Sequence, residues 1–186
     1  MSYSFENKGI TVIIEGVDCA GKSTLIDPLR KVIRGIFWKI TDIPKIGNDA
    51  DKSKIKKYYW KMIETMERFE TTNWIIDRFF PSELVYSKVK RGYEASDDPE
   101  FEEVEIAIRN RKHLVVYCDP GLDTIIERLG NRGDDYVVTE ELKELYERYD
   151  AMYEKLTLNK MRVDTKLPPE EVVKLIGDKL NELYEY

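Results

Sequence analysis

Residues 10 to 23 read Ile-Thr-Val-Ile-Ile-Glu-Gly-Val-Asp-Cys-Ala-Gly-Lys-Ser, an apolar run followed by the complete phosphate-loop pattern G-x-x-x-x-G-K-[ST]. The glycines let successive backbone N–H groups wrap a polyphosphate, Lys22 reaches the β and γ phosphates, and the Ser23 hydroxyl is a ligand for Mg²⁺. A helix that begins near Lys22 adds the positive end of its dipole. The residues expected to surround the phosphates of ATP are Gly16, Asp18, Ala20, Gly21, Lys22, Ser23 and Thr24.

The composition predicts one globular domain over residues 1–186. The chain has 42% hydrophobic and 35% charged residues, enough for a substantial core. No apolar run approaches the ~20 residues of a membrane span, and the first residues lack the features of a signal peptide, so we expect a cytoplasmic protein with no membrane partner. Two cysteines predict reduced thiols rather than a disulfide framework. A net charge of -6 disfavours binding to bulk nucleic acid but leaves open a nucleic-acid acceptor.

Short β-rich runs alternate with helical patterns, which predicts βαβ units around a parallel sheet. Gly35 is expected to end the first helix and Pro169 to begin the last one. The predicted strands are Ile10 to Glu15, Phe37 to Thr41, Trp74 to Asp77, Leu114 to Asp119 and Met161 to Asp164. The predicted helices are Lys22 to Arg34, Lys52 to Glu70, Ser82 to Arg91, Pro99 to Arg111, Leu122 to Leu129, Glu140 to Leu158 and Pro169 to Tyr184.

Acidic residues end three of these strands, at the sheet edge where ligands of open α/β folds bind. Glu15 and Asp77 are candidates to meet a Mg²⁺-bound nucleotide, whereas Asp119, followed by Pro-Gly, is expected to cap a turn. His113 begins the fourth strand at the opposite edge and is expected to be structural.

Phosphoryl transfer needs positive charge around the moving group, because its transition state spreads negative charge over three oxygens. Lys22 and Arg78 are two such cations. Arg128 and Arg132 lie four residues apart in a glycine-containing segment, which predicts a lid around residues 128–138 that closes over the nucleotide. The predicted catalytic residues are therefore Lys22, Arg78, Arg128 and Arg132.

Two motifs resemble thymidylate kinases. The run from Ile13 to Thr24 is similar to that family's phosphate loop, which has an Asp two residues after the first Gly, and the run from Asp77 to Tyr86 is similar to its D-R-[YH]-x-x-S-x-x-[AV]-[YF] segment. The order of elements also agrees, so the resemblance spans almost the whole chain. It implies an α/β phosphate-loop NTPase fold with a five-stranded parallel sheet in the order 2-3-1-4-5 and helices on both faces.

The resemblance also implies roles for single residues. Asp18 would contact the sugar 3′-hydroxyl of a monophosphate acceptor, and Arg78 would hold the acceptor phosphate. Asp77 would order water around Mg²⁺, so the predicted metal residues are Ser23 and Asp77. Tyr86 would pack near the sugar 2′ position and disfavour ribonucleotides, and Ser82 would lie near the base. Because Cys19 occupies a loop position where some members have Arg, the lid would supply that charge.

The sequence departs from the family pattern where the acceptor is read. The region Thr41 to Lys45 has no Arg, although the family's second strand usually ends in one. One of Tyr58, Tyr59 and Trp60 is expected to stack on the base, and Tyr59 is assigned to the acceptor site, but no Arg follows one turn later. Glu83 is unusual beside a thymine, because a carboxylate prefers a donor such as an amino group.

These observations predict a kinase that transfers the γ-phosphoryl group of MgATP to a deoxynucleoside 5′-monophosphate, with dTMP or another pyrimidine nucleotide as the expected acceptor. One alternative is a deoxynucleoside kinase, or a kinase of a modified-base hydroxyl in DNA, with Glu15 as general base. A second alternative is a nucleotide-gated switch. The partner is a small nucleotide; the base, a homodimeric state and the pathway stay open.

Overall fold

The computed structural model describes residues 5–40, 49–132 and 139–185. Five parallel strands form the central sheet in the spatial order β4-β5-β2-β6-β7. Their bounds are Ile10–Glu15 for β2, Ile36–Lys39 for β4, Trp74–Asp77 for β5, Lys112–Cys118 for β6 and Lys160–Val163 for β7. Counted along the chain among these five, the order is 2-3-1-4-5, so the predicted α/β fold is confirmed.

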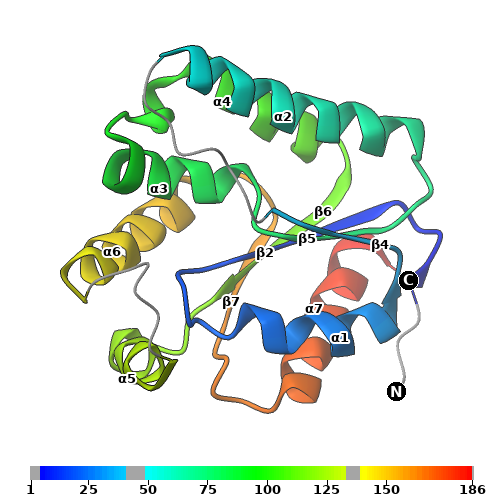
Figure 1. Cartoon of the computed structure of the whole chain (residues 1–186). Coiled ribbons are helices and arrows are strands. Elements are labelled where there is room, and N and C mark those ends of the chain that lie inside the picture. Colours follow the sequence, from blue (N-terminus) through cyan, green and yellow to red (C-terminus); the bar gives the residue numbers. More distant parts are fainter. Residues whose placement is uncertain (1–4, 41–48, 133–138, 186) are drawn as a thin grey trace.

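Helices cover both faces of the sheet (Figure 1). Helices α1 (Lys22–Val32) and α7 (Pro169–Tyr184) pack together on one face. Helices α2 (Asp49–Arg68), α3 (Phe80–Arg91) and α4 (Pro99–Arg109) lie on the other, and a short 3-10 helix, Ala95–Asp97, precedes α4. Helices α5 (Leu122–Arg132) and α6 (Thr139–Lys155) lie near the carboxyl ends of the strands.

The central strand is buried on both sides, as expected for a parallel sheet covered by helices. Every residue of β2 is buried, and its register aligns Val12 with Ile75 of β5 and with Leu114 of β6. The carboxyl ends of β2 and β5 therefore lie side by side, which brings the phosphate loop next to the segment that follows Asp77.

A two-stranded parallel sheet of β1 (Phe5–Glu6) and β3 (Ile33–Arg34) was not predicted. Asn73, fully buried, ties it to the central sheet: its Oδ1 accepts from the backbone N–H of Lys8 and Ile10, and its Nδ2 donates to the carbonyl oxygens of Phe5 and Arg34. Such two-residue strands leave no periodic pattern in a sequence.

The expectation that Gly35 ends the first helix is wrong. Helix α1 ends at Val32 and the chain continues into β3. Gly35 is needed because a Cβ atom there would lie 2.2 Å from the carbonyl oxygen of Asn73, where no side chain fits. The glycine thus permits the close approach of two backbones.

His113 is structural, as predicted. It is buried, its Nδ1 lies 2.7 Å from the carbonyl oxygen of Arg111, and its Nε2 accepts from the N–H of Asn159 at 2.9 Å. Asp119 accepts from the N–H of Gly121, which confirms its turn-capping role.

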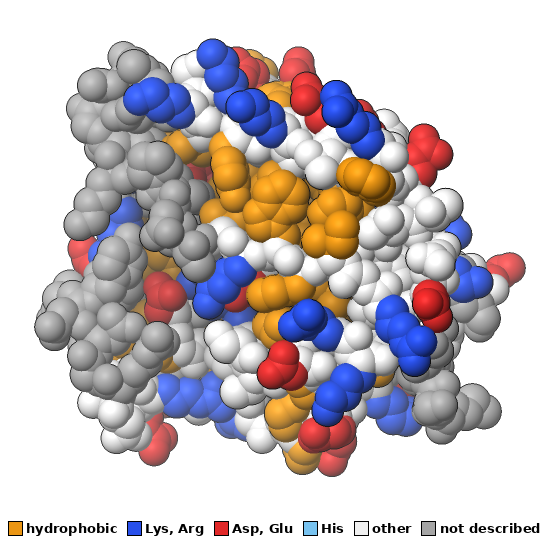
Figure 2. Space-filling model, turned by 45° about the vertical axis from the view of Figure 1, so that its right-hand side comes forward, with side chains coloured by type: hydrophobic (Ala, Val, Ile, Leu, Met, Phe, Trp, Pro, Cys, Tyr) orange, Lys and Arg blue, Asp and Glu red, His pale blue; other side chains and the backbone are white. Residues whose placement is uncertain are grey.

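Several large apolar side chains are exposed on the described surface. Ile36 of β4, Tyr58 of α2 and Phe69 just beyond α2 are each more than a third exposed. Apolar side chains gather in the upper half of the face shown in Figure 2, where lysines and arginines border them. No helix among the described residues is long and apolar enough to cross a membrane.

Gly35→Ala is expected to lower the free energy of unfolding by about 1–3 kcal/mol, because the added methyl group overpacks the Asn73 carbonyl. Urea unfolding followed by circular dichroism measures the loss. Gly130→Ala in α5 is the matched control, since a Cβ atom there meets nothing within 4 Å, and it should leave stability equal or higher. Equal stability of the Gly35 variant and the wild type would contradict the steric argument.

Candidate active site

The phosphate loop joins β2 to α1 as predicted. Gly21 precedes the first residue of α1 with φ +87°, a left-handed conformation suited to glycine. A Cβ atom on Gly21 would lie 2.9 Å from Thr165, which packs against the loop from the segment between β7 and α7. Ser23 and Thr24 are exposed in the first turn of α1.

Lys22 lies at the floor of a cleft of about 620 Å³. Its side chain is buried, and its Nζ donates to the carbonyl oxygens of Gly16 at 2.8 Å and Val17 at 2.7 Å. Burial lowers the pKa of the Lys22 ammonium to about 8, and the Arg78 charge adds to that shift. The lining residues include Asp18, Cys19, Gly21, Lys22, Ser23, Thr24, Lys39, Asp77, Arg78, Arg128 and Thr165.

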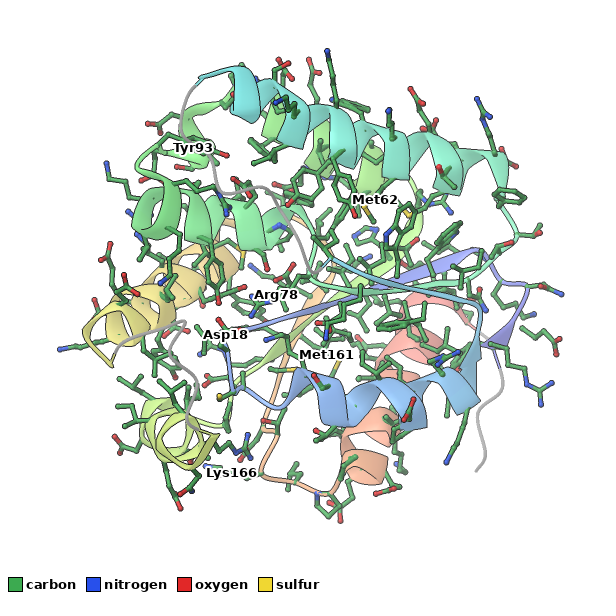
Figure 3. All side chains as sticks on the ribbon, viewed as in Figure 1. Asp18, Met62, Arg78, Tyr93, Met161 and Lys166 are labelled. Atoms are coloured by element: carbon green, nitrogen blue, oxygen red, sulfur yellow. The ribbon has the colours of Figure 1, made fainter. Side chains whose placement is uncertain are left out.

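Asp18 and Arg78 meet in this cleft (Figure 3), and the buried side chain of Tyr86 packs behind them. The Arg78 Nη2 donates to Asp18 Oδ1 at 2.6 Å, and the Tyr86 hydroxyl donates to Asp18 Oδ2 at 2.9 Å. The Arg78 guanidinium also lies over the Tyr86 ring, 4.9 Å from its centroid. Burial opposes ionisation of Asp18, but the Arg78 and Lys22 charges outweigh it and lower the pKa of this carboxyl.

Arg78 follows β5 in a strained conformation. Its φ is +69°, in the left-handed region, and its N–H donates to the carbonyl oxygen of Ile14 in β2 at 3.0 Å. Non-glycine residues in this region cost free energy and are concentrated at functional sites. The backbone is therefore turned so that the guanidinium reaches the loop.

Glu15, at the end of β2, holds the neighbouring segment in place. Its carboxylate is fully buried and accepts from the N–H of Phe79 at 2.7 Å, the Ser82 hydroxyl at 2.6 Å and the Tyr149 hydroxyl at 3.2 Å. Burial raises the pKa of Glu15, while the bonds from Ser82 and Phe79 oppose the rise. Glu15 is not among the residues that line the cleft.

Ser82 was expected near the base, and in the structure its hydroxyl is engaged inside the protein. The side chain is buried, its hydroxyl donates to Glu15, and it does not line the cleft. Ser82 therefore connects α3 to β2 inside the protein.

Asp77 fits a metal ion. It is 4% exposed, its Oδ2 lies 3.8 Å from Lys39 Nζ, and its Oδ1 is buried without a hydrogen-bond partner among the described residues. A buried carboxylate oxygen without a donor is costly unless a cation or water meets it. Asp77 and Ser23 line the same cleft, and oxygen ligands of this kind suit Mg²⁺.

Arg128 contacts the loop from helix α5. Its Nη2 donates to the carbonyl oxygen of Thr165 at 3.1 Å and its Nη1 to that of Cys19 at 3.4 Å, while the Thr165 hydroxyl donates to the carbonyl oxygen of Ala20 at 2.6 Å. Arg132 ends α5, but its side chain and residues 133–138 of the expected lid lie outside the described residues. In this conformation Arg128 bridges the loop and the segment after β7.

The assignment of Tyr59 to base stacking is wrong for this structure. Tyr59 is fully buried, with its ring edge-on to Phe79 at 5.2 Å and to Phe101 at 6.0 Å. Trp60 lines a different hollow with Lys112, the first residue of β6, at the amino ends of the strands. Tyr59 is therefore a core residue. Helical periodicity alone does not distinguish an aromatic residue of the core from one that stacks on a ligand.

Glu83 is also occupied within the protein. Its carboxylate is buried and accepts from Arg91 and from the Tyr93 hydroxyl.

Three further residues complete the site but were not predicted from the sequence: Tyr149, Thr165 and Lys39. Tyr149 has a weak signal, since Tyr146, Tyr149 and Tyr153 share one side of α6, but nothing in the sequence connects Thr165 or Lys39 to the loop.

No family model matches the sequence. The prophage-derived uncharacterized protein YorR of Bacillus subtilis is 30% identical over 159 residues, which cover 83% of this chain and 88% of YorR. The crystal structure of YorR, in complex with phosphorylated GDP, superposes with a TM-score of 0.77 at 27% identity and covers 95% of this chain and 98% of YorR. The chain belongs to the thymidylate kinase-like and deoxynucleoside kinase family of phosphate-loop proteins.

Two further comparisons involve thymidylate kinases by name. A probable thymidylate kinase of Metallosphaera sedula is 27% identical over 151 residues, 73% of this chain and 74% of that protein. The thymidylate kinase of Candida albicans shares the fold, with a TM-score of 0.62 at 15% identity over 96% of this chain and 92% of that one. The predicted family resemblance is confirmed by the similarity to YorR, and the Candida albicans structure confirms the fold.

Nucleotide binding is expected to take up a proton at about pH 8.5, since a pKa near 8 leaves part of the buried Lys22 neutral there and a bound polyphosphate favours the ammonium form. Affinity for MgATP should accordingly fall as the pH rises above 8. Calorimetry in buffers of different ionisation enthalpy measures the uptake, which should be near zero at about pH 6.5 and absent in Lys22→Arg. Equal uptake in the wild type and Lys22→Arg would assign the proton to another group.

Proposed function

We propose that the protein transfers the γ-phosphoryl group of MgATP to the 5′-phosphate of a deoxynucleoside monophosphate. The observation that carries this proposal is the pairing of Asp18 with Arg78 beside Lys22 in one cleft, with Tyr86 bound to both partners of the pair. A cation, a carboxylate and an aromatic ring are the groups that a phosphate, a sugar hydroxyl and a deoxyribose face require. Their placement next to the phosphate loop supports an acceptor site beside the donor site.

The Asp18 and Arg78 ion pair suggests how the acceptor binds. An incoming phosphate would take the place of Asp18 as the partner of Arg78 Nη2, and Asp18 would then accept a bond from the sugar 3′-hydroxyl. Tyr86, held by Asp18 and the Arg78 guanidinium, would press against the sugar at the 2′ position. Binding of the acceptor would thus replace the Asp18–Arg78 bond with one bond from Arg78 to the phosphate and one from the sugar hydroxyl to Asp18.

Lys22 and the loop amides would hold the donor phosphates. Lys22 Nζ would exchange the two loop carbonyl oxygens for phosphate oxygens and would stabilise the charge that develops in the transition state. Asp77 and Ser23 would hold Mg²⁺, which supplies charge neutralisation on the phosphates when bound. Arg128, at the start of the expected lid, also lines the cleft, and we assign it to the same transition-state charge.

The burial of Glu15 argues against the nucleoside kinase alternative. A sugar or base hydroxyl must lose a proton to attack, which calls for a general base within hydrogen-bond reach. Glu15 was the candidate, but its carboxylate is enclosed and engaged by Phe79, Ser82 and Tyr149. An acceptor phosphate is already ionised and needs no such base.

The base of the acceptor is the finer part of the proposal. Glu83 is paired with Arg91 and Tyr93, so it does not act against a thymine as the sequence suggested. The relative from Metallosphaera sedula is named a probable thymidylate kinase, and the YorR structure holds phosphorylated GDP. We therefore propose dTMP and dGMP as the first two acceptors to test.

A coupled assay of ADP release over all deoxy- and ribonucleoside monophosphates tests the proposal. We expect turnover with dTMP, dGMP or both, weaker turnover with the matching ribonucleotides, and little ATP hydrolysis without acceptor. ADP release with thymidine or a hydroxymethylated oligonucleotide and with none of the monophosphates would establish the alternative acceptor. Hydrolysis that ignores every acceptor would indicate a nucleotide switch.

Asp18→Asn is expected to raise the KM for the acceptor roughly 10- to 100-fold, because it weakens a bond from a charged group. The KM for ATP should change less than about threefold, since the loop backbone is unaltered. Asp123→Asn, an exposed position in the first turn of α5, is the control for loss of one negative charge. Intact acceptor affinity together with lost ATP binding would refute the assigned role of Asp18.

A further inference from the structure

The hydroxyl of Tyr149 meets three elements of the site at one point. Tyr149 lies in α6 and is fully buried. Its Oη is 3.0 Å from Arg78 Nη1, 2.8 Å from Ser82 Oγ and 3.2 Å from Glu15 Oε2. One side chain thus connects α6 to the end of β2, to the segment after β5 and to α3.

Counting protons gives these bonds a direction. A guanidinium can only donate and an ionised carboxylate can only accept. The single Ser82 proton goes to Glu15 at 2.6 Å, so Tyr149 accepts from Arg78 and gives its own proton to Ser82 or to Glu15. The result is a one-way chain of hydrogen bonds from the Arg78 cation to the Glu15 anion, in which each bond polarises the next.

The ring of Tyr149 is fixed as firmly as its hydroxyl. It stacks on Tyr117 of β6 with 5.6 Å between centroids and 13° between planes, and its neighbour on another side is Tyr86, edge-on at 6.1 Å. Burial raises the pKa of Tyr149 well above its ordinary value, so the hydroxyl keeps its proton at neutral pH. A rigid, neutral hydroxyl is a fixed reference point for a flexible arginine.

The remaining bonds to Arg78 show why this point matters. Nη2 is held by Asp18, which a bound acceptor phosphate would displace, and Ser82 Oγ is 3.5 Å from Nη1, at the limit of a hydrogen bond. When the bond from Arg78 to Asp18 is lost, Tyr149 is the close hydrogen-bond acceptor that remains for the guanidinium among the described residues.

We infer that Tyr149 is a positioning residue, which orients the Arg78 guanidinium toward the acceptor phosphate and ties that orientation to helix α6. The inference rests on the proposed function, in which Arg78 holds that phosphate. Helix α6 begins directly after residues 133–138, so the chain that follows the expected lid supplies this contact. Any displacement of α6 along the reaction changes the hold on Arg78.

Tyr149→Phe tests the inference, because it keeps the stacked ring and removes only the hydroxyl. We expect kcat/KM for the acceptor to fall roughly 10- to 100-fold, as for a lost bond to a charged group, with the KM for ATP within about twofold of wild type. Tyr153→Phe is the matched control: it lies one turn further along α6, its ring also packs on Tyr117, and its hydroxyl makes no hydrogen bond within the described part of the chain. It should keep wild-type kinetics.

A double-mutant cycle with Arg78→Lys separates positioning from plain stabilisation. If Tyr149 acts through Arg78, adding Tyr149→Phe to Arg78→Lys should lower kcat/KM for the acceptor by less than about threefold, compared with Arg78→Lys alone. Additive losses, or full acceptor activity in Tyr149→Phe, would overturn the inference. If Tyr149→Phe does not fold, Ser82→Ala replaces it in the double-mutant cycle with Arg78→Lys, because it removes the oxygen 2.8 Å from the Tyr149 hydroxyl. The same limits for the change in kcat/KM then apply.

The failure of the proposed function would be visible separately. A wild-type protein that phosphorylates no monophosphate refutes the proposed function, and the cycle is then measured as affinity for inorganic pyrophosphate by calorimetry. A loss of affinity in Tyr149→Phe that vanishes on the Arg78→Lys background supports positioning of Arg78. Unchanged affinity in Tyr149→Phe would refute it.

Discussion

A buried carboxylate at the end of the central strand sets the geometry of the site. Glu15 has no exposed surface, and a buried anion is tolerated only when donors satisfy it. Its donors come from the first residue after Arg78, from α3 and from α6. The requirement to satisfy one charge therefore fixes how three separate segments of the chain approach the phosphate loop.

The same requirement explains the strained backbone at Arg78. The N–H of Arg78 is committed to Ile14 and that of Phe79 to Glu15, so the chain leaves β5 in a turn dictated by the neighbouring strand. The left-handed φ of +69° is the conformational cost of that turn. In return the guanidinium is carried over the loop, where Asp18 and Tyr149 hold it from two sides.

The sequence predicts those parts of the molecule that local pattern encodes. Trp74 to Asp77 and Pro169 to Tyr184 were predicted with the observed bounds, because one is a short buried run and the other an amphipathic helix opened by proline. The loop and the Asp77 and Arg78 pair follow from motifs. The roles of Tyr59, Gly35 and Tyr149 could not be predicted in this way, because they depend on packing between elements. Tyr59 is buried in the core, a Cβ atom on Gly35 would lie 2.2 Å from another backbone, and the Tyr149 hydroxyl is shared by distant segments.

The charges that line the cleft constrain how phosphates can enter it. Four described cations lie there, Lys22, Lys39, Arg78 and Arg128, against the two carboxylates Asp18 and Asp77. Both carboxylates are paired, Asp18 with Arg78 and Asp77 with Lys39, and Arg128 is bound to carbonyl oxygens. In the proposed function a second phosphate group would compete with Asp18 for Arg78, because in the described residues every lining cation is already engaged. An acceptor would favour that exchange by giving Asp18 a new donor, which a sugar hydroxyl next to the phosphate provides. In the proposed function, recognition of the phosphate and recognition of the sugar would therefore be linked.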